Sequence, residues 1–174
     1  MTDELVNGLY RGWADRVADV LSYENPNFRY ANLAIRGKLL PQVVADQIPD
    51  ALKMIETNTL LSFHAGANDV IRPNYDAKIT LPAYAKAVRE LSKSGANLML
   101  FTVMERTDRT GRAQTYWENR FKDFNKQVRE LAEECGAILV EVMTFMIPWF
   151  WRRVRGKSSG DGRVAKYPEL RAWP

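Results

Sequence analysis

The sequence has little cysteine and little histidine: 174 residues include one of each, Cys135 and His64. A disulfide framework needs paired cysteines and a zinc finger needs several Cys or His ligands, so both are excluded. The longest strongly apolar run, residues 145–151, is much shorter than the roughly 18–20 residues that cross a bilayer. Asp3 and Glu4 stand where a signal peptide would be basic and then apolar. These absences predict a cytoplasmic protein with no metal site and no cofactor.

An excess of positive charge is confined to the end of the chain. The formal net charge is +4, yet residues 151–174 alone hold seven basic and two acidic side chains. The preceding 150 residues therefore carry a net charge of −1. Because a nucleic-acid-binding domain normally presents a basic face on its folded body, we expect no nucleic-acid partner. The content of 46% hydrophobic and 26% charged residues is typical of a globular domain.

The body of the chain alternates between helical and strand-like patterns. Apolar residues at 3.6-residue spacing predict helices, and short, nearly continuous apolar runs predict strands buried on both faces. The predicted helices are residues 10–21, 39–55 with a break near Pro49, 80–94 and 115–135. The predicted strands are residues 28–35, 59–63, 97–103 and 137–142. Strands that alternate with helices form parallel sheets, so the sequence predicts a three-layer α/β/α sandwich.

Two of the predicted helices have a well-defined apolar face. On the first helix this face consists of Trp13, Val17, Val20 and Leu21. On the last helix it consists of Phe121, Phe124, Val128 and Leu131. Gly136 is placed to end the last helix. In the helix of residues 80–94, Thr80 is a candidate N-cap, Pro82 suits the first turn and Gly95 ends the helix.

Two loops follow predicted strands at the end of the sheet where α/β proteins bind ligands. Arg36-Gly37 follows the strand of residues 28–35, and Gly66-Ala67-Asn68-Asp69 follows that of residues 59–63. Together with Tyr10-Arg11-Gly12-Trp13, these blocks resemble the SGNH (GDSL-type) hydrolases, a family of esterases, lipases and acyl hydrolases. The resemblance covers roughly residues 8–143. It implies a flavodoxin-like sheet with strand order 2-1-3-4-5, and the hydrolysis of a small-molecule ester by a serine nucleophile.

The resemblance also implies an oxyanion hole. In the family, its donors are the nucleophile's own amide, a glycine amide and an asparagine side chain. The last two roles fall on Gly37 and Asn68, with Gly66 and Asp69 supporting the second loop. Such preorganised donors each contribute about 2.7–4 kcal/mol to acyl transfer. The alternative is structural: Gly37 would be a turn residue before a helix, and Asn68-Asp69 an Asx turn in which Asp69 caps the residues after it.

The family's catalytic serine and histidine have no counterpart in this sequence. The Gly-Asp-Ser block on the strand before the first helix is absent, as is the Asp-x-x-His near the end. His64 lies two residues before Gly66, and we expect it to be a packing residue at the end of a strand. No nucleophile or base is therefore identified. We predict a fold that lacks its first strand, and no useful esterase activity from this chain alone.

The two ends of the chain suggest further hypotheses. Residues 1–143 are predicted to form a partial SGNH hydrolase domain, and residues 144–174 a basic, aromatic-containing and poorly ordered tail. The change of composition near Met143, with a start just after the missing serine block, favours a truncated, frameshifted family member or a gene model of one. Two other roles stay open: association with a membrane surface through residues 145–157, and non-catalytic binding of an acyl carbonyl by Gly37, Asn68 and Arg72.

Overall fold

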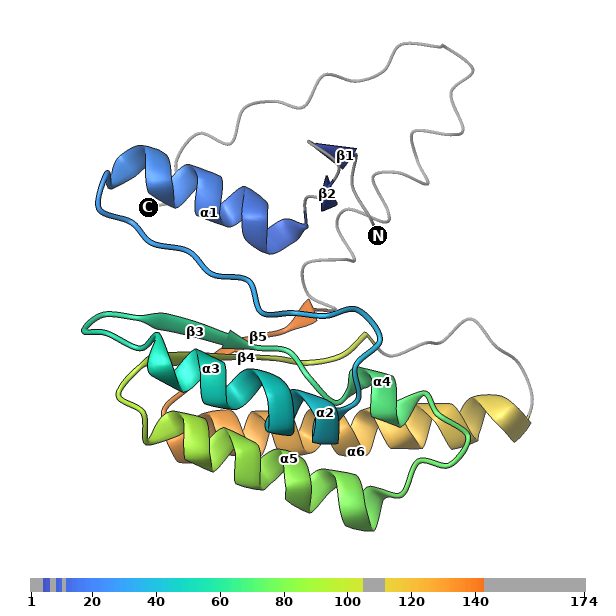
Figure 1. Ribbon diagram of the computed structural model, residues 1–174. Coiled ribbons are helices and arrows are strands. Elements are labelled where there is room, and N and C mark those ends of the chain that lie inside the picture. Colours follow the sequence, from blue (N-terminus) through green and yellow to red (C-terminus); the bar gives the residue numbers. More distant parts are fainter. Residues whose placement is uncertain (1–4, 7–8, 11, 105–111, 143–174) are drawn as a thin grey trace, which may run out of the picture. The chain divides into compact units, whose positions relative to one another are not determined.

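The computed structural model describes residues 5–6, 9–10, 12–104 and 112–142 (Figure 1). The described residues fall into two compact units: the first lies within residues 1–61 and 65–97, and the second lies within residues 62–64 and 98–174. The elements are, in order, β1 (Leu5–Val6), β2 (Leu9–Tyr10), α1 (Trp13–Glu24), α2 (Leu40–Gln42), the π-helical turn η1 (Val43–Gln47), α3 (Ile48–Lys53), β3 (Leu60–Phe63), α4 (Ala67–Val70), α5 (Ala77–Ser92), β4 (Asn97–Phe101), α6 (Arg112–Cys135) and β5 (Ile138–Val140).

The main sheet has three strands in the order β3-β4-β5. β4 and β5 are parallel, with Met99 opposite Ile138 and Phe101 opposite Val140. The helix α6 connects these two strands, as the alternating pattern of the sequence predicted. The predicted α/β class is therefore confirmed. A separate two-stranded antiparallel sheet is formed by β1 and β2.

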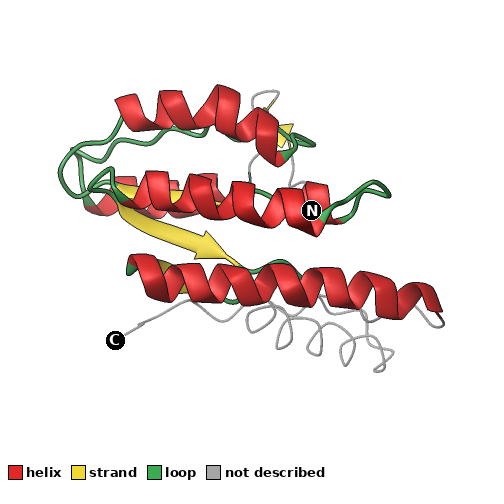
Figure 2. Cartoon of the chain, turned by 90° about the horizontal axis from the view of Figure 1, so that it is seen from below, coloured by secondary structure: helices red, strands yellow, loops and turns green. Residues whose placement is uncertain are grey.

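The core of the second unit is built on α6, which has 24 residues (Figure 2). Its predicted apolar face is buried. The exposed fractions are 4% for Phe121, 0% for Phe124, 0% for Val128 and 2% for Leu131. Full burial of such side chains stabilises a fold by about 1.5–3 kcal/mol each. The helix ends as predicted, because Gly136 has a φ of +62°, a conformation that favours glycine.

In the first unit, α5 begins earlier than the sequence predicted. Its N-cap is Asp76, whose side chain accepts a hydrogen bond from the Lys78 amide at 2.8 Å. The prediction of Thr80 as N-cap was therefore wrong, and Pro82 lies inside the helix and not in its first turn. Aspartate is among the residues most favoured at the N-cap, so the helix begins after Asp76 and continues past Pro82. The buried face of α5 consists of Tyr84, Ala85, Ala87, Val88 and Leu91.

The predicted helix of residues 39–55 is divided into three parts by the π-helical turn η1. The turn ends at Gln47, and the amide of Ile48 bonds to the carbonyl oxygen of Val43. A proline ring inside an α-helix clashes with the carbonyl four residues earlier, and the wider turn directly before Pro49 relieves this clash. The predicted break near Pro49 is confirmed.

The predicted strand of residues 28–35 was wrong, because the structure assigns no strand to this segment. A strand exists only through the hydrogen bonds of a neighbouring strand, and no strand of the described part pairs with this segment. Its side chains are mostly exposed, including Ile35 at 57%. A β-forming composition was therefore insufficient without a partner.

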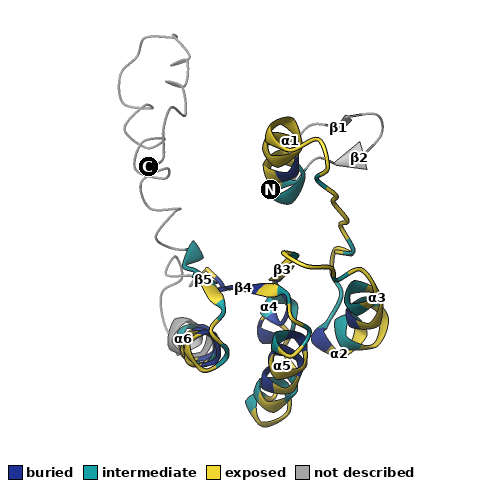
Figure 3. Cartoon of the chain, turned by 90° about the vertical axis from the view of Figure 1, so that its left-hand side faces the viewer, coloured by how far each residue is buried: buried dark blue, intermediate teal, exposed yellow. Residues whose placement is uncertain are grey.

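Burial also differs from expectation on α1 and β3. The helix α1 forms as predicted, but its apolar face is exposed, and Figure 3 shows most of the helix in the colour of exposed residues. Trp13 is 51% exposed and Val20 is 60% exposed. In β3, Leu60 is 50% exposed, so this strand is not buried on both faces. At least half of the surface of each of these three residues is therefore exposed.

Candidate functional site

Two side-chain hydrogen bonds join the loop at Gly37 to the loop at Asn68. The Asn68 Nδ2 atom donates to the carbonyl oxygen of Lys38 at 3.0 Å. The Oδ2 atom of Asp69 accepts from the backbone amide of Leu40 at 2.9 Å. These bonds link positions 30 and 29 residues apart in the sequence. The structure therefore brings together the two loops on which the sequence analysis placed a carbonyl-binding site.

Glycine is required in both loops by the backbone conformation. The φ angles are +83° at Gly37 and +91° at Gly66, a region that other residues rarely adopt. A Cβ atom at Gly37 would meet no atom within 4 Å, so the space beside this backbone is open. Gly66 is the N-cap of α4, and its carbonyl oxygen accepts from the amides of Asp69 and Val70. Gly37 is thus both a turn residue and a residue that another molecule can approach.

The orientation of the Asn68 amide is set by its partner. A carbonyl oxygen only accepts hydrogen bonds, so the Asn68 NH2 group and not its oxygen faces Lys38. This NH2 group carries a second hydrogen, for which the described residues offer no partner. Asn68 can therefore hold the loop with one hydrogen and donate the other to a ligand oxygen.

Asp69 connects the two loops and does not cap the helical residues after it. Its carboxylate accepts from Leu40, which precedes it by 29 residues, so the Asx-turn interpretation does not account for this bond. Burial raises the pKa of Asp69 above its ordinary value, while the Leu40 amide and the charge of Arg72 act in the opposite direction. Asp69 is therefore a partly desolvated structural carboxylate.

His64 directly follows β3 and packs against an aromatic ring. Its imidazole is stacked on Phe101, with ring centroids 5.1 Å apart and planes inclined by 24°. The loss of hydration lowers the pKa of His64. No hydroxyl or thiol in the described part of the chain donates a hydrogen bond to its ring. This environment agrees with the predicted packing role, since a general base needs a nucleophile within hydrogen-bond distance.

A polar network in the second unit was missed by the sequence analysis. The side chain of Asn125 accepts from the Val103 amide at 2.7 Å and donates to the Val103 carbonyl oxygen at 2.9 Å. The side chain thereby supplies, just after β4 ends, the two hydrogen bonds that a neighbouring strand would otherwise make to the backbone of Val103. The sequence pattern could have predicted this network. Asn125 falls on the same helical face as Phe121 and Val128, where a polar side chain must find buried hydrogen-bond partners.

The same network continues to β5. Thr102 is 1% exposed, and its hydroxyl donates to Glu141 at 3.1 Å and accepts from the Val142 amide at 3.0 Å. Arg129 on α6 donates two hydrogen bonds to the Glu141 carboxylate, at 2.6 and 3.0 Å. The Arg129 bonds, followed by the Thr102 bond, lower the pKa of Glu141. These contacts hold the carboxyl ends of β4 and β5 together.

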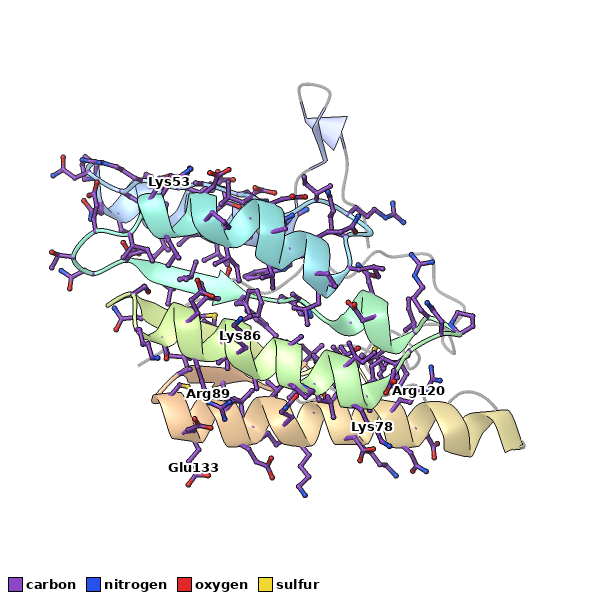
Figure 4. All side chains as sticks on the ribbon, turned by 60° about the horizontal axis from the view of Figure 1, so that its bottom comes forward. Lys53, Lys78, Lys86, Arg89, Arg120 and Glu133 are labelled. Carbon is purple, nitrogen blue, oxygen red and sulfur yellow. The ribbon has the colours of Figure 1, made fainter. Side chains whose placement is uncertain are left out.

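Three further observations concern a surface depression, metal binding and membrane spanning. A shallow depression on α5 is lined by Lys86, Arg89, Glu90 and Lys93, and Figure 4 labels two of these charged side chains on the helix surface. The described residues contain no cluster of His, Cys, Asp and Glu that could hold a metal ion. None of the helices described is long and apolar enough to cross a membrane. The predicted tail, residues 144–174, lies outside the described residues.

Comparison with solved structures gives several esterases of similar fold. Axe2, an acetylxylan esterase from Geobacillus stearothermophilus, is 19% identical with a TM-score of 0.62, and the alignment covers 77% of this chain and 64% of Axe2. The acetyl xylan esterase AlAXEase is 14% identical with a TM-score of 0.63, covering 83% of this chain and 75% of that one. The esterase EstA from Pseudoalteromonas sp. is 18% identical with a TM-score of 0.58, and the alignment covers 75% of this chain and 66% of EstA.

The chain thus spans less than two thirds of the length of Axe2. Comparison with curated proteins gives no match. The model of one protein family, described as GDSL-like lipase/acylhydrolase, matches residues 2–162, which is most of the chain. The fold of its solved neighbours agrees with this match. The chain belongs to the GDSL-like lipase/acylhydrolase family.

Proposed function

We propose that this chain keeps the carbonyl-binding loops of an ester hydrolase and lacks the residues that attack the carbonyl. The Gly37 amide and the Asn68 side chain would donate to the carbonyl oxygen of a small ester. The observation that carries the proposal is the pair of hydrogen bonds from Asn68 to Lys38 and from Leu40 to Asp69. These bonds hold two donors in place before a ligand arrives, which is what stabilisation of a developing oxyanion requires.

The proposal of inactivity rests on the missing nucleophile and base. An oxyanion hole lowers a barrier only when a nucleophile adds to the carbonyl and a base removes its proton. The sequence has no Gly-Asp-Ser block and no Asp-x-x-His, and its one histidine is stacked on Phe101. We therefore propose that the chain alone binds a small acyl group without hydrolysing it. Similarity to two acetylxylan esterases makes an acetyl ester the first ligand to test.

Turnover of p-nitrophenyl acetate by the purified chain tests the inactivity. We expect the same rate of p-nitrophenol release for the unmodified chain, for Asn68→Ala and for a blank without protein. Sustained turnover that Asn68→Ala abolishes would show that a nucleophile is present and would overturn the proposal.

Binding is tested separately by nuclear magnetic resonance, with triacetin as the ester. We expect progressive shifts of the Gly37 amide and of the Asn68 side-chain NH2 signals in the unmodified chain, and no shift of the Gly37 amide in Asn68→Ala. Asn74→Ala is the matched control, because Asn74 is an exposed asparagine of the same region. An equal response of Asn74→Ala and Asn68→Ala would argue against a site at Asn68. The predicted membrane-surface role of residues 145–157 stays a prediction.

A further inference from the structure

The chain around Gly37 forms a β-turn in which the amide of Gly37 has no protein partner. The amide of Lys38 donates to the carbonyl oxygen of Ile35 at 3.4 Å, which closes the four-residue turn. Of the two central residues, only Gly37 has a positive φ, which is the pattern of a type II turn. The described residues provide no acceptor for the Gly37 amide. This amide therefore remains available to a ligand.

The backbone that follows Gly37 is held by α4. The carbonyl oxygen of Lys38 accepts from the Asn68 side chain at 3.0 Å. The amide of Leu40 donates to the Asp69 carboxylate at 2.9 Å. Both partners belong to α4. Because these two contacts come from one element, a contact from a second element restricts the orientation of the turn further.

The π-helical turn η1 supplies this second contact. The Nζ atom of Lys38 donates to the Oδ2 atom of Asp46 at 2.9 Å, and the two side chains form an ion pair. The Lys38 side chain is 27% exposed, whereas Lys53, which pairs with Asp50, is 74% exposed. A charge that is partly shielded from water is screened less than a fully exposed one. Lys38 is thus held from two elements, directly beside Gly37.

We propose that Asp46 is a positioning residue of the carbonyl-binding site, because through Lys38 it fixes the turn that presents the Gly37 amide. This inference rests on the proposed function, in which Gly37 and Asn68 donate to a ligand oxygen. Asp46 acts only through its neighbour and makes no contact with the ligand. A turn that is held before the ligand arrives needs no ordering during binding, so a fixed Gly37 amide gives a higher affinity than a mobile one.

Titration of the full chain with triacetin, followed by nuclear magnetic resonance, tests this role. Asp46→Asn removes the charge and keeps the size of the side chain, and we expect it to weaken binding about two- to five-fold. Asp46→Glu keeps the charge and should weaken binding less than about two-fold. In about 1 M sodium chloride, which screens the ion pair, the unmodified chain should bind as weakly as Asp46→Asn.

The matched control is Asp50→Asn, which removes the charge of another paired aspartate. Asp50 accepts from Lys53 at 2.7 Å, and its side chain is 55% exposed, against 54% for Asp46. We expect Asp50→Asn to bind triacetin as the unmodified chain does. If Asp46→Asn binds as tightly as the unmodified chain, or if both substitutions weaken binding equally, Asp46 has no positioning role.

A measurement without ligand separates this inference from the proposed function. Nitrogen-15 relaxation of the unliganded chain reports the order of the Gly37 amide on the ps–ns timescale. We expect a lower order parameter for Gly37 in Asp46→Asn than in Asp50→Asn and the unmodified chain. An unmodified chain that binds no triacetin would refute the proposed function, and lowered order in Asp46→Asn would still show that Asp46 fixes the turn. Unchanged order of Gly37 in Asp46→Asn would overturn the positioning role, whether or not triacetin binds.

Discussion

The helices α1 and α6 have similar sequence patterns and opposite surroundings. Each carries four large apolar residues at helical spacing on one face. On α6 these side chains are at most 4% exposed, whereas on α1 they are 38–60% exposed. The pattern produced a helix in both cases. Burial occurred only for α6, which packs in its unit against the strands that it connects. Amphipathic spacing therefore predicts a helix and its apolar face, but a covering surface must come from elsewhere in the fold.

The largest expected effect compares one apolar side chain from each helix. Phe124→Ala on α6 should destabilise the protein by about 3–5 kcal/mol, because it leaves a cavity at a fully buried site. Val20→Ala on α1 should change the free energy of unfolding by less than about 0.5 kcal/mol, because Val20 is 60% exposed. Urea denaturation of both variants measures the difference. Similar losses for the two would mean that the apolar face of α1 is covered in solution.

An intermediate effect is expected for the buried polar residue of α6. Asn125→Ala removes both side-chain bonds to Val103 and leaves a buried amide and carbonyl unpaired. Each unpaired group costs about 1–3 kcal/mol. Asn125→Asp keeps the acceptor and loses the donor. Its defect should differ from that of Asn125→Ala, because it adds a charge at a site that is 1% exposed. A loss below about 0.5 kcal/mol for Asn125→Ala would show that water replaces the side chain.

The smallest effects concern one carboxylate near each helix. Glu141 is paired with Arg129 of α6, and Asp15 of α1 accepts from the Tyr30 hydroxyl at 2.8 Å. Glu141→Gln should cost up to about 1 kcal/mol at neutral pH, because the ion pair is partly exposed. Tyr30→Phe should cost less than about 0.5 kcal/mol, since this hydrogen bond lies at the surface. Urea denaturation at neutral pH measures both.

The pH dependence of stability separates these two sites further. Arg129 lowers the pKa of Glu141 below its ordinary 4.5, so the folded state binds this proton less readily than the unfolded state. The stabilisation is therefore complete above pH 4.5 and is lost as the pH falls through the lowered pKa. In Glu141→Gln this part of the acid-induced loss should disappear. An unchanged acid profile would mean that the ion pair does not contribute in solution.

Local sequence signals predicted a large part of the fold and of the candidate site. The face of α6, its end at Gly136 and the strands β4 and β5 could be predicted from spacing and from glycine chemistry. The loops at Gly37 and Asn68 were predicted to lie at one site, and two hydrogen bonds join them. These features could be predicted because they depend on neighbours in the chain, or on the rule that ligands bind at the carboxyl ends of parallel strands. The roles of Gly37 and Asn68 in carbonyl binding remain a proposal.

The tertiary structure alone decided which elements have partners. Residues 28–35 have a β-forming composition, but a strand requires the hydrogen bonds of a second strand, and the described part of the chain supplies none. The sequence around Asp69 was compatible with a local Asx turn, but its carboxylate accepts a hydrogen bond from the Leu40 amide in a distant loop. Asn125 lies on the apolar face of α6, but only the folded structure shows that its side chain bonds to Val103 at the end of β4. The sequence determined local conformation through spacing and backbone geometry; burial and long-range hydrogen bonding depended on which surfaces the folded chain brought together.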